Sequence, residues 1–303
     1  MKIIQSGTSN TLCPYLAKPL SDGFDTNKEH ILPVALGAPE SFFIVASASE
    51  NTRLNDLVDA PMINDPAIKM LSVLAEVKTR SGRKIANMHG TTAFGDEFIA
   101  DVTKDSVALR FRSPVIKDEK TGEIIGVKGF GDSVFEEARK ISDRMISRGR
   151  EVQIGGPIVM LEDKSPVEMS IVSDQSLMRR ESIKAAYLLT VKAYGDAAIT
   201  SKSGQIFRAA IEADTEEALT MSGLHWRNLP ADHYKLEPAL KAKHHMLFTS
   251  LKDDWLFSQV VLFGGISFAF WTPRDDIDQS NCFYGKIIDA SRGRFINRPE
   301  EQE

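Results

Sequence analysis

A glutamate and a histidine stand side by side in an apolar segment near the N-terminus, and an asparagine follows about twenty residues later. These residues are Glu29, His30 and Asn51. Neighbouring side chains of a β-strand point to opposite faces. The Glu29 carboxylate can therefore hold a metal ion while His30 faces a second space, in which a water molecule is activated. The pattern predicts a metal-dependent site that hydrolyses phosphodiester bonds.

Each of the three side chains suits one part of this chemistry. Phosphodiester hydrolysis needs a nucleophilic water, a base that deprotonates it and a cation that neutralises the developing charge. The oxygen atoms of Glu29 and Asn51 are hard ligands that suit Mg²⁺ or Mn²⁺. His30, with an ordinary pKa near ~6.5, suits the general base. We therefore expect one catalytic divalent ion.

Three local elements are expected to position these residues. Glu29 to Leu32 is predicted to form a strand, and the apolar, partly β-branched run from Ser41 to Ala46 a second one. Residues Glu50 to Val58 have leucine and valine at helical spacing, with Ser49 as a candidate N-cap. The predicted order is strand, strand, helix.

The prolines at 61 and 66 indicate a boundary. We expect residues 1–66 to form one domain and residues 67–303 a larger mixed domain of unknown role, regulatory or nucleic-acid-binding. The later sequence alternates strand-like and helical segments without an internal repeat. The predicted fold class is α+β.

The N-terminal pattern resembles the HNH endonuclease family, which has a treble-clef-like ββα-metal fold. The resemblance covers residues 12–62 and rests on Glu29-His30-Ile31-Leu32-Pro33 with Leu36-Gly37, then Asn51, then Asp59-Ala60-Pro61. It implies that Glu29 and Asn51 bind the metal and that His30 is the base. It also implies that the substrate is DNA, with RNA as an open alternative.

The chain departs from this family at the zinc knuckle, which many members build from two CxxC pairs. The first pair would be Cys13-Pro14-Tyr15-Leu16, with one cysteine, and the second would be Ser47-Ala48-Ser49-Glu50, with none. We expect no structural zinc. The loss leaves open a degenerate descendant that binds nucleic acid or regulates without cleaving.

Several polar and basic residues near the motif are candidate phosphate contacts. A basic loop directly after the expected nuclease unit could follow a phosphate backbone, although a solvated turn explains it equally well. The pair His244-His245 is expected to lie in a solvated basic segment. The candidate phosphate contacts are Arg53, Asn55, Lys78, Arg80, Arg83 and Lys84.

Composition limits the remaining choices. The 303 residues include 42 acidic and 37 basic side chains, and the net charge of -5 gives no support to nucleic-acid binding unless a local basic patch is present. The two cysteines, Cys13 and Cys282, exclude a disulfide framework and a four-cysteine zinc site. No signal peptide or membrane-spanning run is apparent, so we expect a cytoplasmic protein without a membrane partner.

The expected partners follow from these interpretations. A single site per chain implies that cutting both strands needs two visits or a homodimer. A further alternative assigns the main activity to residues 67–303, which would bind a small molecule or a protein that activates the nuclease.

Overall fold

The computed structural model describes residues 2–3, 7–79, 82–83, 85–92, 94–153, 155, 168–169, 171–229, 242–274, 277 and 282–296. Helices and antiparallel sheets are both present, so the predicted α+β class is confirmed. The chain divides into two compact units, one of residues 1–84 with 173–303 and the other of residues 85–172. This division differs from the expected one at residue 66, which lies inside the first unit.

Asp65 explains why the chain does not separate at the two prolines. Its carboxylate accepts hydrogen bonds from the backbone of Ala67 and Ile68, and so caps the helix that Pro66 begins. The same carboxylate accepts hydrogen bonds from Ser173 Oγ and from the backbone nitrogen of Asp174. Pro66 therefore starts a helix of the first unit, as proline often does at the first helical position.

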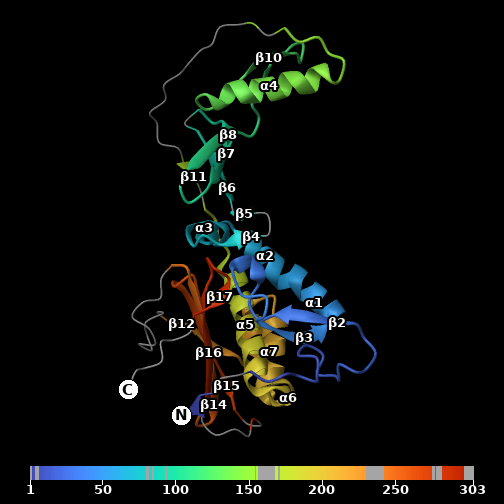
Figure 1. Cartoon of the computed structure of the whole chain (residues 1–303), viewed down its shortest axis with the longest axis vertical. Helices are drawn as coiled ribbons and strands as arrows, with labels where there is room; N and C mark the ends of the chain where they lie inside the picture. The colour runs from blue at the N-terminus through green and yellow to red at the C-terminus, as the bar shows by residue number, and fades with distance from the viewer. Residues whose placement is uncertain are drawn as a thin grey trace. The chain divides into compact units, whose positions relative to one another are not determined.

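A seven-stranded sheet forms one side of the first unit, next to helix α5 (Gln175–Tyr194) (Figure 1). Its order is β1-β16-β13-β14-β15-β12, with β17 beside β16, and only β1 runs parallel to its neighbour. The strands are β1 (Lys2–Ile3), β12 (His225–Asn228), β13 (His244–Lys252), β14 (Trp255–Leu262), β15 (Ile266–Pro273), β16 (Cys282–Asp289) and β17 (Arg294–Phe295).

A long helix packs against this sheet. Helix α5 (Gln175–Tyr194) contacts β13, β14 and β15 on one side and α7 and the N-terminal elements on others. It is buried around its whole circumference over most of its length, as expected for a helix enclosed by other elements. The shorter helices near it are α6 (Asp196–Thr200), α7 (Lys202–Glu212) and α8 (Glu216–Met221).

The N-terminal part of this unit contains the expected strand, strand and helix. Strands β2 (Thr26–His30) and β3 (Phe43–Ser47) form an antiparallel pair, and α1 (Ala48–Leu54) follows directly. The predicted order is thus confirmed, with both strands displaced by one to three residues. The remaining elements are the 3-10 helix η1 (Val34–Leu36), the π-helix η2 (Asn55–Asp59), α2 (Ala60–Asn64), α3 (Pro66–Leu74), β4 (Lys78–Thr79) and β5 (Gly82–Arg83).

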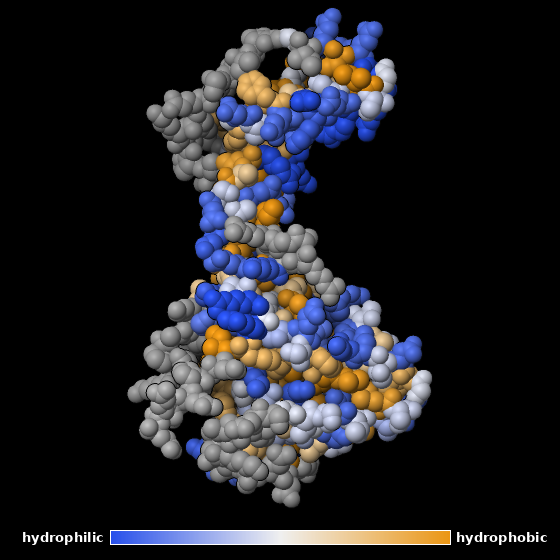
Figure 2. All heavy atoms as spheres, in the orientation of Figure 1, coloured by the Kyte–Doolittle hydropathy of each residue, from blue (hydrophilic) through white to orange (hydrophobic). Residues whose placement is uncertain are grey.

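The second unit is a smaller α+β structure. In the part of this unit that the structure describes, a four-stranded antiparallel sheet, a separate hairpin and one helix surround a small core that includes Phe98 and Ile141. Figure 2 shows mostly hydrophilic residues over this unit's helix. Arg139, Lys140 and Arg144 of the helix are exposed. The elements are β6 (Ala86–Thr91), β7 (Glu97–Val102), β8 (Val107–Phe111), β9 (Val115–Lys117), β10 (Ile124–Val127), α4 (Ser133–Ile146) and β11 (Glu168–Met169).

Candidate functional site

Strand β2 presents Glu29 and His30 to different environments. Glu29 is 1% exposed, whereas His30 is only partly buried. The alternation agrees with the opposite orientation of neighbouring strand residues. The inward face of β2 thus carries the carboxylate, and the imidazole lies on the outer side.

The Glu29 carboxylate meets a lysine in the interior. Lys184 Nζ, on α5, lies 2.8 Å from Glu29 Oε1, and both side chains are almost completely buried. The same ammonium group contacts the carboxylate of Asp59 at the end of η2. Glu181 is fully buried one turn earlier on α5. The interior cluster therefore contains three carboxyl groups and one ammonium group.

The carboxyl groups and the ammonium group of this cluster stabilise each other's charged forms. Burial alone would lower the pKa of Lys184, but the carboxyl groups of Glu181, Glu29 and Asp59 outweigh it and raise the pKa above its ordinary value. Lys184 is therefore a permanent cation at neutral pH. Burial raises the pKa of Glu29, and the Lys184 ammonium opposes that rise. A protein cation thus stands beside the carboxylate for which the sequence predicts a metal ion.

Asn51 connects α1 to β2. Its Nδ2 donates hydrogen bonds to Asn27 Oδ1 over 2.7 Å and to the Lys28 carbonyl over 2.9 Å. Asn27 and Glu29 are two residues apart in the strand, so they share one face. The structure therefore brings Asn51 to the Glu29 face of β2, where its amide braces the helix against the strand. Its role as a metal ligand stays a prediction.

His30 occupies the other face together with an aromatic ring and a lysine. The imidazole lies 6.4 Å from the ring of Phe43, and Lys28 Nζ lies 4.6 Å from the same ring. Burial lowers the pKa of His30, and Glu40 opposes this effect only in part. The imidazole is consequently neutral at pH 7, the protonation state that a general base requires.

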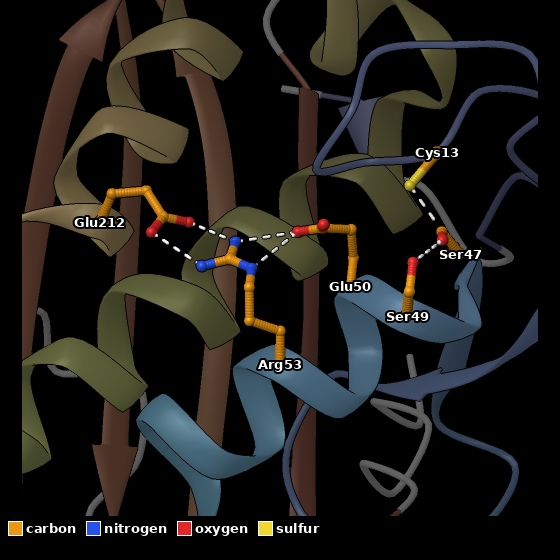
Figure 3. A network of polar contacts seen from close by, with 6 residues as sticks. All are labelled: Cys13, Ser47, Ser49, Glu50, Arg53 and Glu212. Carbon is orange, nitrogen blue, oxygen red and sulfur yellow. Dashed lines mark hydrogen bonds and ion pairs between the residues drawn. The ribbon is translucent and has the colours of Figure 1, made fainter.

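The residues for which the resemblance implies a zinc knuckle lie next to one another. The Ser47 backbone nitrogen donates a hydrogen bond to Cys13 Sγ over 3.4 Å, and the hydroxyls of Ser47 and Ser49 are 2.9 Å apart (Figure 3). Cys13 is completely buried. Glu50, at the fourth knuckle position, binds Arg53 instead. Two segments with the predicted spacing therefore meet, although only one of their four positions is a cysteine.

Among the candidate phosphate contacts, Arg53 is already bound to two carboxylates. Its Nη2 lies 2.8 Å from Glu50 Oε2, and its Nη1 lies 2.9 Å from Glu212 Oε2 on α7 (Figure 3). The hydrogen bonds that its guanidinium donates to the Glu212 carboxylate raise the pKa of Arg53, and those to Glu50 add to this rise. Its guanidinium connects α1 to α7, so its charge is largely neutralised before any phosphate approaches.

The other candidates are less constrained. Asn55 Nδ2 donates to Asp56 Oδ1 over 3.1 Å within η2. Lys78 is exposed in β4 and lies opposite Arg83 in the β4–β5 pair. Arg80, Lys84 and the side chain of Arg83 lie outside the described residues. The phosphate role of this loop stays a prediction.

Sequence reasoning missed the interior partners of Glu29. It gave no role to Lys184 and Glu181, which lie in the buried helix α5. A carboxylate and an ammonium three residues apart in such a helix face the same side, and this spacing was the available signal for a buried charge cluster.

His245 was also placed wrongly. The sequence predicted a solvated basic segment, but His245 lies in β13 with 0% exposure. Its Nε2 lies 2.8 Å from the Leu36 carbonyl oxygen, and its Nδ1 accepts a hydrogen bond from the Phe263 backbone nitrogen over 3.2 Å. Both ring nitrogens therefore have structural partners.

No protein-family model, curated protein or solved structure matches the chain. Within the described ranges, no group of three or more histidine, cysteine, aspartate or glutamate side chains is arranged to hold a metal ion. None of the helices described here combines the length and the apolar character needed to cross a membrane.

Proposed function

We propose that this chain is a nucleic-acid-binding protein built on an HNH-type ββα unit that does not cleave its ligand. One observation carries the absence of cleavage: Lys184 Nζ lies 2.8 Å from Glu29 Oε1, with the two side chains 0% and 1% exposed. A metal ion at Glu29 would have to displace a buried ammonium that Asp59 also binds. Like charges at this separation repel strongly in a low-dielectric interior. The residues present do not fit a catalytic metal at Glu29.

Nucleic-acid binding is supported by the resemblance of residues 12–62 and by the basic loop that follows the ββα unit. Lys78 is the basic residue of this loop whose side chain the structure describes, and it is exposed. Lysine binds phosphate as a point charge and releases counterions from the nucleic acid. The proposal thus places the contact with nucleic acid near β4 and β5.

The experiment combines cleavage and binding on the full chain. Supercoiled plasmid is incubated with the purified protein in Mg²⁺, in Mn²⁺ and in chelator, and binding of a labelled duplex is followed by fluorescence anisotropy in chelator over a range of salt concentrations. We expect intact plasmid in all three buffers and an affinity that falls as salt rises. Lys78→Met should weaken binding. Cleavage that requires the metal, or affinity independent of salt, contradicts the proposal.

A metal-dependent endonuclease is the second candidate, and His30 favours it. The imidazole is only partly buried, and its lowered pKa keeps it neutral. Asn51 also reaches the Glu29 face of β2. In this case the plasmid is cut, and His30→Gln abolishes cutting while leaving duplex binding intact. The matched control is His225→Gln, which makes the same change at an exposed strand histidine of β12.

A nuclease controlled by a ligand or partner of residues 67–303 stays a further prediction from the sequence. The interior contact between β2 and α5 bears on it, because Lys184 of that region binds Glu29 directly. A protein that cuts only after a small molecule or protein is added would support this alternative.

A further inference from the structure

The Glu181 carboxyl group is enclosed without a hydrogen-bond donor. Glu181 is 0% exposed, and neither of its oxygens has a hydrogen-bond partner in the part of the chain that the structure describes. The neighbouring side chain that influences it most is another carboxyl group, that of Asp59. An ionised carboxylate in such a place costs several kcal/mol unless it is paired or hydrogen-bonded. Two neighbouring carboxyl groups can form a hydrogen bond with each other only if one of them carries a proton.

The charges around Glu181 lead to the same requirement. The groups that face the cluster are Tyr15 from the N-terminal segment, Glu29 from β2, Asp59 from η2 and Lys184 from α5. Three ionised carboxylates would oppose the single Lys184 ammonium and leave an excess of two negative charges. The ammonium is already shared between Glu29 and Asp59. Glu181 is the one carboxyl group that Lys184 does not bind in an ion pair.

We propose that Glu181 and Asp59 form a buried proton-binding site, in which Glu181 is neutral at neutral pH and its O–H donates to the Asp59 carboxylate. The proton comes from solvent as the unit folds and returns to solvent when it unfolds. Asp59 keeps its contact with Lys184 in this arrangement. One proton thereby satisfies the Glu181 carboxyl and removes one of the two excess charges.

The direction of the acid–base equilibrium agrees with this assignment. Burial, followed by the Asp59 carboxyl, raises the pKa of Glu181 well above its ordinary value. The unfolded chain loses this proton above pH ~4.3, whereas the folded chain retains it. Unfolding therefore releases one proton in this pH range, and this site alone raises the unfolding equilibrium constant about tenfold for each pH unit.

Two glutamate-to-glutamine changes in the same cluster have opposite expected results. Glu181→Gln replaces a neutral acid by a neutral amide that can donate to Asp59 and needs no proton from solvent on folding. The urea midpoint of this variant should therefore be close to that of the unmodified protein near pH ~4.3 and higher than it at pH 7. Glu29→Gln removes an ionised partner of Lys184 and should lower the midpoint clearly. Between pH 5 and 7, Glu181→Gln should also lose the tenfold increase in the unfolding constant per pH unit.

Infrared spectroscopy of the full chain tests the proton directly. At pH 7 the unmodified protein should show the carbonyl stretch of a protonated carboxyl group, and ¹³C-labelling of glutamate should shift this band. Glu181→Gln should remove it and Glu29→Gln should retain it. Absence of the band at pH 7, or equal midpoint losses in the two variants, would overturn the proposal. If Glu181→Gln does not fold, the ¹³C-shifted band of the unmodified protein still decides.

Discussion

The backbone nitrogen of Ser47 donates a hydrogen bond to the Sγ atom of Cys13 over 3.4 Å, although 34 residues separate the two along the chain. Cys13, the first position of the first CxxC pair, therefore contacts Ser47, the first position of the second pair. The contact joins the two segments through one cysteine, and neighbouring apolar residues such as Phe42 and Ile44 pack into the main core. A buried thiol behaves as a small apolar group and a weak acceptor.

Restoring the three missing cysteines should create a zinc site. The variant Leu16→Cys/Ser47→Cys/Glu50→Cys should bind one Zn²⁺, because the two CxxC pairs would then supply four thiolates near the Cys13–Ser47 contact. Zinc content by mass spectrometry and the d–d absorption of Co²⁺ report the site. The matched control adds Cys13→Ser, which should reduce the affinity strongly. Equal metal content in both variants would show that the segments do not form a knuckle.

Removing the interior ammonium should be severely destabilising. Lys184→Met leaves Glu29 and Asp59 buried without their cation, and breaking such a pair from one side costs about 3–5 kcal/mol. Urea unfolding followed by tryptophan fluorescence measures the loss. The double variant Glu29→Gln/Lys184→Met should regain part of the lost free energy of unfolding, because only the Asp59 carboxylate then remains without its cation. Additive losses would argue against a direct pair.

Lowering the pH should reduce the free energy of unfolding through His245. Nε2 donates to the Leu36 carbonyl and Nδ1 accepts from the Phe263 N–H, so the folded state holds the neutral ring. Burial lowers the pKa of His245 to about 4. The contribution of the neutral His245 ring to the free energy of unfolding is complete above pH ~6.5, the ordinary pKa of histidine. It decreases as the pH falls towards 4, by about 1.4 kcal/mol per pH unit and about 3 kcal/mol in all.

Unfolding curves at several pH values between 4 and 7 test the His245 effect. His245→Asn should be less stable at pH 7 and should lack this part of the pH dependence. The exposed His225→Asn serves as control and should retain it. Identical pH profiles for the unmodified protein and His245→Asn would exclude His245 as the source.

Arg53 should contribute little to stability and little to nucleic-acid binding. Its side chain is 42% exposed, so the bridge between Glu50 and Glu212 is screened by water. Arg53→Met should lower the free energy of unfolding by roughly 0.5–1 kcal/mol. Duplex affinity should change less than in Lys78→Met, because both carboxylates already occupy the guanidinium. A larger affinity loss in Arg53→Met would restore Arg53 as a phosphate contact.

The local pattern of the sequence was enough to predict the strand–strand–helix order and the different environments of Glu29 and His30. Strand periodicity is a property of neighbouring residues and needs no knowledge of the rest of the chain. The α+β class followed in the same way from alternating strand-like and helical segments. Glycine and proline positions were less informative, because Pro66 begins a helix where a domain boundary was expected.

Only the tertiary structure decided what the Glu29 carboxylate faces. Asp59 and Lys184 are 125 residues apart, and the second compact unit lies between them in the sequence. A carboxylate that points inward can bind a metal or an ammonium, and the choice depends on which distant element covers that face of β2. Strand periodicity carries no information about that element. Packing of α5 against β3 and η2 brings Lys184 to the carboxylate, and the same packing encloses Glu181.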